Sequence, residues 1–295
     1  MDGFTQFLKT EYGDVPYEEN FDFSLRSSIG VGGKARLAFY PRTAEETIRL
    51  LDAFDDSGVK YHVLGNLTNV LPPENTESIV VSTAKLRGVQ RRKKGVFAYA
   101  GTRSNEFLRC LENAELTGAE FLAGIPCTLG GAAFMNAGVS GKYLSEIVES
   151  VLFYSEKQLQ VLPVSECEYA YKNSLFMQKK GVILGVNFRL KNSDKANIER
   201  ERIFYISKRV HLPKGKSMGC VFKNPSGGVA GKFVDGAGLK GLRLGGAKIA
   251  EEHANFIIND GNATVKDVKT LISLMKNAVF AQYKIRLEEE IRYLD

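Results

Sequence analysis

The apolar positions of this chain follow two periods, and their alternation predicts a mixture of helices and short strands. Helical spacing begins after Thr43, where Glu46 three residues later predicts a capping box. The apolar stripe of this helix continues at Ile48, Leu51 and Phe54. The first clear element of the chain is therefore expected to be an amphipathic helix that buries one face.

Runs of β-branched and aromatic residues predict strands around this helix. These runs cover residues 61–64, 78–83, 95–100, 148–154, 158–162 and 182–190. Residues 193–210 are charged and lack a clear apolar period, which predicts a connector with some helix. A second capped helix is expected at Thr264 and Asp267, with Val268, Leu271, Ile272 and Met275 as its apolar stripe. Alternating residues predict a last strand over about 286–294.

The stretch from Gly124 to Gly141 breaks both periods. It holds five glycines and three alanines and carries no charge. Interior glycines each cost roughly 0.5–1 kcal/mol in a helix or strand, so we expect neither element here. Large apolar residues such as Leu129 and Phe134 favour burial over a disordered linker. The composition fits a buried wall against a flat ligand and fits equally well a buried turn without one.

Length and composition limit the class of protein. A chain of 295 residues suffices for two domains, and 44% hydrophobic with 25% charged residues is typical of globular proteins. No window of about 18 apolar residues predicts a membrane span, and the N-terminal residues lack the apolar core of a signal peptide. The net charge of +6 is compatible with a polyanionic substrate and is weak evidence for nucleic acid.

The four cysteines are widely spaced. Cys110, Cys127, Cys167 and Cys220 form no C-x-x-C pair, which argues against a metal knuckle and a disulfide framework. This pattern favours the reducing cytosol. We therefore expect a cytoplasmic protein without a metal site, without nucleic-acid or membrane partners, and with no obligate protein partner evident.

Several motifs together resemble one family. The string Gly-Ile-Pro-x-Thr-Leu-Gly-Gly-Ala-x-x-Met-Asn-Ala-Gly resembles the flavin-binding signature of the MurB family, the UDP-N-acetylenolpyruvoylglucosamine reductases of peptidoglycan synthesis. Further matches follow in family order along nearly the whole chain, in the shorter branch that lacks an inserted tyrosine loop. By this resemblance, non-covalent FAD is bound by Ile29, Gly30, Gly32, Gly33, Gly65, Asn66, Leu67, Thr68, Asn69, Gly124, Ile125, Pro126, Thr128, Gly130, Gly131, Asn136, Ala137 and Gly138.

Leu67 departs from the family pattern. The family has a glycine at this place in its pyrophosphate loop, whereas the flanking Gly65, Asn66, Thr68 and Asn69 match. A side chain at a position that requires positive φ costs roughly 1–2 kcal/mol. We expect Leu67 to affect the shape of this loop.

Three residues stand at positions that are catalytic in the family. Lys172 takes the place of an arginine in the pattern aromatic-x-Tyr-Arg-x-Ser-x-Phe, and it would neutralise the substrate carboxylate. Cys220 replaces the serine of Gly-Ser-x-Phe-Lys-Asn-Pro, which donates a proton to the substrate. Glu290 matches the glutamate of the closing Leu-Glu-Pro-Glu-Val-Arg, with Glu289 in place of the proline. Without the resemblance, these residues are equally well a solvated lysine, a buried cysteine and part of a surface charge run.

The resemblance also implies a substrate side. Tyr171, Lys223, Asn224 and His253 lie in matching segments and would address the nucleotide sugar. His253 has no acidic cluster around it in the sequence, so we interpret it as a turn residue and not as a metal ligand.

The fold implied by the resemblance is α+β. Residues 1–192 would form the two-subdomain FAD-binding fold of the vanillyl-alcohol-oxidase (PCMH) type, divided at about 84/85. Residues 193–295 would form a smaller α/β substrate-binding domain, with its last strand returning toward the flavin.

The implied activity is the NADPH-dependent reduction of the enolpyruvyl double bond of UDP-N-acetylglucosamine enolpyruvate to UDP-N-acetylmuramate. This reaction serves peptidoglycan and cell-wall synthesis, and through it cell shape, division and the cell cycle. Two alternatives stay open at this point. One is a catalytically weakened paralogue that binds flavin or a nucleotide sugar, and the other is a different flavin oxidase on the same fold.

Overall fold

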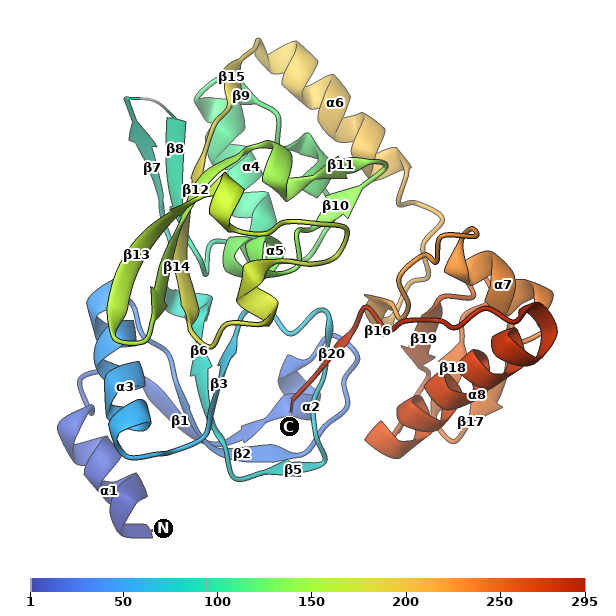
Figure 1. Cartoon of the computed structure of the whole chain (residues 1–295), viewed down its shortest axis with the longest axis horizontal. Helices are drawn as coiled ribbons and strands as arrows, with labels where there is room; N and C mark the ends of the chain where they lie inside the picture. Colours follow the sequence, from blue (N-terminus) through green and yellow to red (C-terminus); the bar gives the residue numbers. More distant parts are fainter. Residues whose placement is uncertain (1, 94, 295) are drawn as a thin grey trace. The chain divides into compact units, whose positions relative to one another are not determined.

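The computed structural model describes residues 2–93 and 95–294 (Figure 1). Its helices are α1 (Asp2–Glu11), α2 (Phe23–Arg26), α3 (Ala44–Asp56), α4 (Ser104–Asn113), α5 (Leu129–Phe134), α6 (Lys195–Ser207), α7 (Ala230–Gly236) and α8 (Val265–Tyr283). Its strands are β1 (Tyr17–Asp22), β2 (Lys34–Phe39), β3 (Tyr61–Leu64), β4 (Val70–Leu71), β5 (Asn75–Thr76), β6 (Ile79–Ser82), β7 (Val89–Arg92), β8 (Gly95–Tyr99), β9 (Leu116–Thr117), β10 (Gly138–Val139), β11 (Lys142–Tyr143), β12 (Val148–Ser155), β13 (Gln158–Pro163), β14 (Val182–Phe188), β15 (Lys191–Asn192), β16 (Lys216–Cys220), β17 (Arg243–Leu244), β18 (Ala247–Ile249), β19 (Phe256–Asn259) and β20 (Arg292–Tyr293).

The chain forms two compact units, each with its own apolar core. Unit 1 comprises residues 1–19, 37–66 and 78–210, and unit 2 comprises residues 20–36, 67–77 and 211–295. The sequence places a boundary at 192/193, whereas the compact units divide at 210/211 and give two N-terminal segments to unit 2. The expected flavin-binding regions are divided between the units: Ile29–Gly33 belongs to unit 2, residues 124–138 belong to unit 1, and residues 65–69 are split after Asn66.

Unit 1 is built on two sheets. In the first, β3 pairs with β6 in parallel, and β6 pairs in parallel with the end of β2 at Ala38 and Phe39. The second is antiparallel with the strand order β13-β12-β14-β8-β7. Every residue of β14 from Val182 to Val186 is buried, so this central strand buries both of its faces. Helices α3 and α4 each bury one apolar face in the same core.

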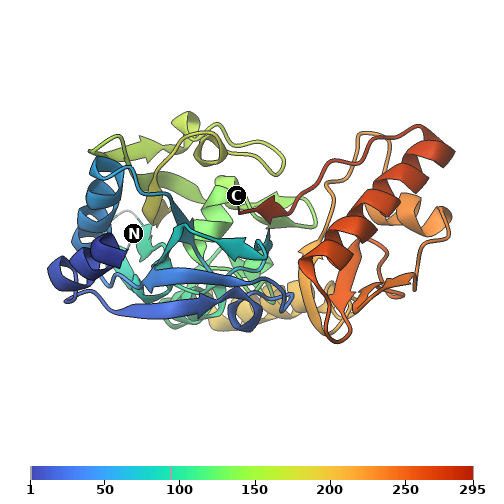
Figure 2. The same ribbon diagram turned by 90° about the horizontal axis from the view of Figure 1, so that it is seen from below.

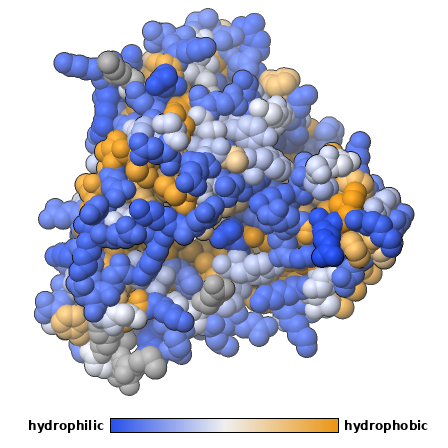
Figure 3. All heavy atoms as spheres, in the orientation of Figure 1, coloured by the Kyte–Doolittle hydropathy of each residue, from blue (hydrophilic) through white to orange (hydrophobic). Residues whose placement is uncertain are grey.

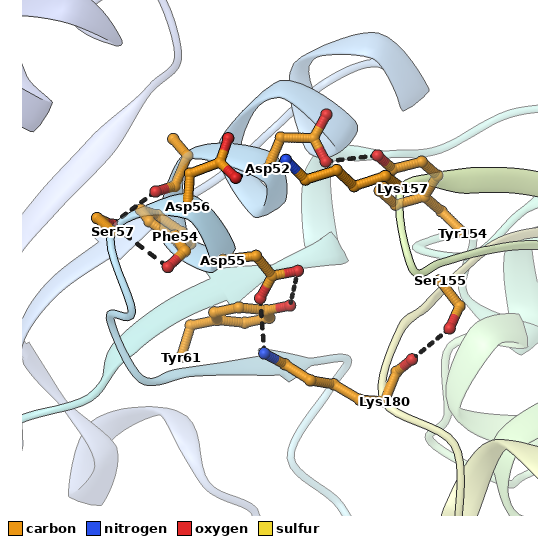
Figure 4. Close-up of polar contacts among 11 residues, drawn as sticks. Asp52, Phe54, Asp55, Asp56, Ser57, Tyr61, Tyr154, Ser155, Lys157 and Lys180 are labelled. Atoms are coloured by element: carbon orange, nitrogen blue, oxygen red, sulfur yellow. Dashed lines mark hydrogen bonds and ion pairs between the residues drawn. The ribbon is translucent and has the colours of Figure 1, made fainter.

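Three polar contacts hold helix α3 against the second sheet (Figure 4). They join Tyr154 Oη to Asp52 at 2.5 Å, Lys157 Nζ to Asp56 at 2.5 Å and Lys180 Nζ to Asp55 at 2.6 Å. Burial and the hydrogen bond to Asp52 raise the pKa of Tyr154 to about 12, so this phenol stays protonated. These contacts hold helix α3 against the second sheet within unit 1.

Unit 2 contains a small antiparallel sheet with helices α7 and α8, together with the N-terminal segments that carry α2, β4 and β5. The strand order is β16-β19-β18-β17, and the long helix α8 packs on β17 and β18 (Figures 1 and 2). Its core includes Val268, Leu271 and Met275 of α8, as the predicted stripe requires. After α8, β20 pairs in parallel with β4, through Arg292 opposite Val70 and Tyr293 opposite Leu71.

The two predicted helix caps have different outcomes. The cap at Thr264 and Asp267 is confirmed and is a full capping box, because each side chain accepts the other residue's backbone N–H. Thr43 does accept the N–H of Glu46 at 3.0 Å, but Glu46 accepts the N–H of Arg42 and not that of Thr43. The second half of that prediction is wrong. The Glu46 carboxylate also binds the Arg42 guanidinium at 3.0 Å, and this contact holds it at the N–H of Arg42, one residue before Thr43.

The prediction that the glycine-rich stretch contains no helix is also wrong. Helix α5 runs from Leu129 to Phe134 through both central glycines, and Thr128 accepts the N–H of Gly131 as its N-cap. Gly130 has a packing reason, since a Cβ there would lie 2.7 Å from the Cβ of Ala100. Tertiary packing against β8 thus outweighs the low helix propensity of glycine.

Hydrophilic side chains dominate the face drawn in Figure 3, and hydrophobic ones appear there as scattered patches. Within residues 2–93 and 95–294, no helix is long and apolar enough to cross a membrane.

Candidate active site

The expected flavin-binding segments of unit 1 meet at one place. The side chain of Asn66, just after β3, donates to the backbone oxygen of Pro126 at 2.8 Å. Thr128, two residues later, is buried and caps α5. The strand-to-loop turn and the glycine-rich stretch, 60 residues apart in sequence, are therefore in direct contact.

The loop that carries Tyr171 and Lys172 is anchored to the same stretch from both sides. Asn136 donates to the oxygen of Ala170 at 2.9 Å, and Ser174 donates to the oxygen of Phe134 at 2.6 Å. Lys172 itself has φ of 52°, an uncommon conformation for a residue with a side chain. This anchoring places Lys172 next to the expected flavin wall.

The turn at Ile29 and Gly30 is held by the strands of unit 2. Asn259 of β19 donates from its side chain to the oxygens of Ile29 and Gly30 at 3.0 and 3.1 Å. Ser28 donates from its hydroxyl to the oxygen of Ser217 in β16 at 2.6 Å. Ile29 is fully buried in the core of the unit.

Leu67 adopts the strained conformation that the sequence predicts for it. Its φ is 51°, in the left-handed region, and its side chain is only 6% exposed. Its oxygen accepts the N–H of Ser28 at 3.1 Å. The loop keeps a glycine-like backbone at this position, and burial of the leucine side chain offsets the conformational cost.

Cys220 and Glu290 lie in neighbouring segments. The N–H of Glu290 donates to the oxygen of Val221, the residue after Cys220, at 2.7 Å. The oxygen of Glu290 accepts from the side chain of Asn69 at 3.0 Å, and the N–H of Arg292 returns to the oxygen of Asn69 at 2.9 Å. The end of β16, the loop at Asn69 and the closing segment are thus joined, although they are distant in sequence.

The environments of the cysteines separate Cys220 from two others. Burial raises the pKa of both Cys127 and Cys167 to about 11, which leaves those thiols protonated and out of reach of solvent. Cys220 is partly exposed and stands at the end of β16, opposite Phe256 of β19. Cys220 therefore differs from Cys127 and Cys167 in being partly exposed, and it lies next to the Glu290 segment.

The expected substrate-binding residues of unit 2 have protein partners in the structure. Lys223 forms an ion pair with Glu288 at 2.5 Å, and Asn224 accepts the N–H of Ala230 at the start of α7 at 3.0 Å. Burial lowers the pKa of His253, whose Nδ1 accepts the N–H of Asn255 at 3.2 Å. His253 is therefore held as a neutral ring. Within the described ranges, no three His, Cys, Asp or Glu side chains gather as a metal site.

Sequence reasoning missed several residues that shape the site. Asn255 holds Phe222 by accepting its N–H and donating to its oxygen, both at 2.9 Å. Glu289 accepts from Lys276 at 2.7 Å and from Tyr293 at 2.5 Å. Asn255 lies in a segment that matches the family pattern, and this match could have indicated its importance. Glu289 stands where the family has proline, so no motif indicates it.

The residues present fit FAD. The segments 29–33, 65–69 and 124–138 carry no carboxylate, so no acidic group of theirs repels a pyrophosphate. Their backbones are fixed by the contacts of Asn66, Asn69 and Asn259 described above. Lys172 belongs to unit 1, whereas Cys220 and Glu290 belong to unit 2.

Comparison with known proteins agrees with this chemistry. A family model described as FAD binding domain matches residues 35–158, and a second, described as UDP-N-acetylenolpyruvoylglucosamine reductase, C-terminal domain, matches residues 211–294. The protein is thus a flavoprotein oxidoreductase of the α+β class, as the sequence predicts.

Similar proteins with curated names narrow the class. UDP-N-acetylenolpyruvoylglucosamine reductase of Caldicellulosiruptor bescii is 35% identical and covers 98% of this chain and 91% of its own length. The enzyme of the same name from Thermosipho melanesiensis is 37% identical, and the match covers 90% of this chain and 91% of that protein. The crystal structure of the enzyme (MurB) from Thermus caldophilus aligns with a TM-score of 0.80 at 33% identity, over 95% of this chain and 99% of that one. The chain belongs to the UDP-N-acetylenolpyruvoylglucosamine reductase family.

Proposed function

We propose that this protein reduces the enolpyruvyl double bond of UDP-N-acetylglucosamine enolpyruvate to give UDP-N-acetylmuramate, with NADPH as reductant. Family membership over nearly the whole chain supports this proposal most directly. FAD held by residues 29–33, 65–69 and 124–138 would supply the hydride-transfer chemistry between NADPH and a vinyl carbon of the substrate. The protein's own residues must then place the substrate, stabilise the developing negative charge and supply one proton.

Lys172 is the residue that neutralises the substrate carboxylate in this proposal. Hydride addition at one vinyl carbon puts negative charge on the other, and the charge spreads into the carboxylate as an enolate. A fixed cation lowers the energy of that state. The anchoring of its loop by Asn136 and Ser174 supports this role, because a positioned ammonium costs little reorganisation during the reaction.

Cys220 is the proton donor in this proposal, and Glu290 holds the polarising network beside it. The thiol gives its proton to the carbon that carries the enolate charge, and the resulting thiolate recovers a proton from solvent. The bond between Glu290 N–H and Val221 oxygen supports the pairing, since it fixes the two segments side by side. Asn69 couples this pair to the loop expected to hold the flavin pyrophosphate.

The C-terminal domain, from about residue 193, binds the nucleotide sugar in this proposal. Tyr171, Lys223, Asn224 and His253 address its UDP-sugar portion, and residues 1–192 hold FAD without a covalent bond. Lys223 would exchange its ion pair with Glu288, whose side chain is exposed, for a phosphate or sugar oxygen. We place the reaction in cytoplasmic peptidoglycan precursor synthesis, and thus in cell-wall formation, cell shape and division. The wide spacing of the four cysteines in the sequence supports a reducing compartment.

Separate half-reactions test the function. Purified protein should release FAD on heating, NADPH should bleach the bound flavin without oxygen, and the UDP-enolpyruvyl sugar should restore its colour. Flavin that is bleached by NADPH but restored only by oxygen or a small alcohol would point to the alternative oxidase activity. A protein that binds flavin and is not reduced by NADPH would point to a weakened paralogue.

A further inference from the structure

The turn at Gly30 carries a lysine that the proposed reaction does not use. The side chain of Lys216, at the start of β16, crosses directly over Gly30. A Cβ placed on Gly30 would lie 2.7 Å from Lys216 Cδ and 3.3 Å from Lys216 Nζ. Gly30 also has φ of 68°, a conformation that disfavours side chains. The glycine therefore leaves the space that the lysine occupies.

The backbone fixes this lysine at the turn. Lys216 pairs with Asn259 in the sheet, and Asn259 donates to the oxygens of Ile29 and Gly30. The hydroxyl of Ser28 binds the oxygen of Ser217, the next residue of the same strand, at 2.6 Å. The contacts of Asn259, which pairs with Lys216, and of Ser217, which follows it, therefore hold the backbone of Lys216 close to the turn.

The charge of Lys216 has no carboxylate partner among residues 2–93 and 95–294. Lys34, at the other end of the turn, differs: hydrogen bonds from Ser24 lower the pKa of Asp22, and the charge of Lys34 adds to this effect. An ammonium without an acidic partner remains available to an anionic ligand at low desolvation cost.

Lys216 adds a charged donor at a turn where part of the backbone is already engaged. The N–H of Gly30 donates to the oxygen of Ser27 at 3.0 Å, and the N–H of Gly33 donates to the oxygen of Pro73 at 2.9 Å. These two amides are used inside the protein and are not available to an anion. The ammonium of Lys216 lies against the same turn and can bind an anion there.

From these observations we propose that Lys216 is a binding residue for a nucleotide diphosphate, namely the pyrophosphate of FAD at the Gly30 turn. The inference rests on the proposed function, since it takes FAD as the cofactor held there. The diphosphate of the UDP-sugar carries the same chemistry, and the experiment below separates the two ligands.

The test is the affinity of flavin-free protein for flavins, measured by fluorescence quenching. Lys216→Met keeps the aliphatic stem over Gly30 and removes the charge; it should raise the Kd for FAD about three- to tenfold. Riboflavin has no phosphate, so its Kd should not change. Lys216→Arg should bind FAD nearly as the parent does. Lys266→Met, which removes an exposed lysine of α8 in the same unit, is the matched control and should leave both values unchanged.

Raised salt should narrow the difference between the parent and Lys216→Met, because screening weakens the lost interaction. An unchanged Kd for FAD in Lys216→Met, or an equal loss for riboflavin, overturns the inference. A change confined to the KM of the UDP-sugar assigns the lysine to the substrate and also overturns it. If the parent protein does not bind FAD, the proposed function is wrong. If the parent binds FAD and Lys216→Met binds it with the same Kd, only the inference about Lys216 is wrong.

Discussion

Glu289 is a residue whose replacement should perturb both the fold of unit 2 and the reaction. It stands where the family pattern has proline, and its carboxylate is held from two sides. Lys276 of α8 donates at 2.7 Å and Tyr293 of β20 donates at 2.5 Å. Through these bonds Glu289 fixes the segment that places Glu290 beside Val221.

The size of the effect follows from the exposure of the partners. The Lys276 side chain is 42% exposed, so its ion pair is screened and contributes about 0.5 kcal/mol. The Glu289 side chain is 20% exposed, and a hydrogen bond to a charged group contributes about 1.5 kcal/mol. Glu289→Ala should therefore cost about 2 kcal/mol and lower the apparent Tm by roughly 4–8 °C.

The pH dependence gives the sign of the electrostatic part. Burial opposes ionisation of Glu289, yet the hydrogen bonds from Lys276 and Tyr293 lower its pKa below the usual 4.5. A carboxyl with a lowered pKa in the folded state stabilises the fold above its unfolded pKa, and the contribution is lost as the pH falls through the folded value. The stability difference between the parent and Glu289→Gln should be full at pH 7 and should shrink below about pH 4.5.

Thermal unfolding and single-turnover kinetics together check this prediction. Glu289→Ala should slow reoxidation of reduced flavin by substrate and leave reduction by NADPH unchanged. Glu251→Gln, which breaks the exposed pair with Lys248 in the same unit, is the control and should change stability by less than about 0.5 kcal/mol. A Glu289→Ala protein with parental Tm and parental reoxidation rate would refute the reasoning.

Three further predictions concern single positions. Lys172→Ala should slow the reoxidation of reduced flavin by substrate. Lys172→Arg should retain or increase the rate of this step, because a guanidinium offers two donors to one carboxylate. A parental rate in Lys172→Ala would show that this lysine takes no part in the step. Cys220→Ala should stall reoxidation while NADPH reduction proceeds, and Cys220→Ser should restore it, so normal turnover in Cys220→Ala would move the proton donor elsewhere. Leu67→Gly should relieve about 1–2 kcal/mol of backbone strain at φ of 51°, but removal of the buried side chain should cost about 2–4 kcal/mol of stability. The free energy of unfolding, measured by chemical denaturation, should therefore decrease, and a more stable variant would contradict this prediction.

The sequence predicts much of the fold because local signals act over short distances. The stripe of α8 and its capping box need only neighbouring residues, and both are present in the structure. The positive φ at Leu67 also follows from the loop pattern alone. The family resemblance identifies the class of protein because its motifs extend over both units.

The remaining features depend on contacts between distant segments. Helix α5 forms in spite of two glycines because Gly130 packs closely on Ala100, and no local signal encodes that contact. Asn259 binds the turn at Ile29 from 230 positions away in the chain. Asn69 meets Glu290 across 221 positions, so the grouping of site residues in unit 2 becomes visible only in the structure.

The most direct test of the proposed function is the stoichiometry and product of a complete turnover. The protein with its bound flavin is mixed without oxygen with NADPH and the UDP-enolpyruvyl sugar, and both NADPH loss and the mass of the sugar are followed. The account predicts one NADPH consumed for each sugar converted, and a product heavier than the substrate by two hydrogens. NADPH oxidation that leaves the sugar mass unchanged, or that requires oxygen, would contradict it.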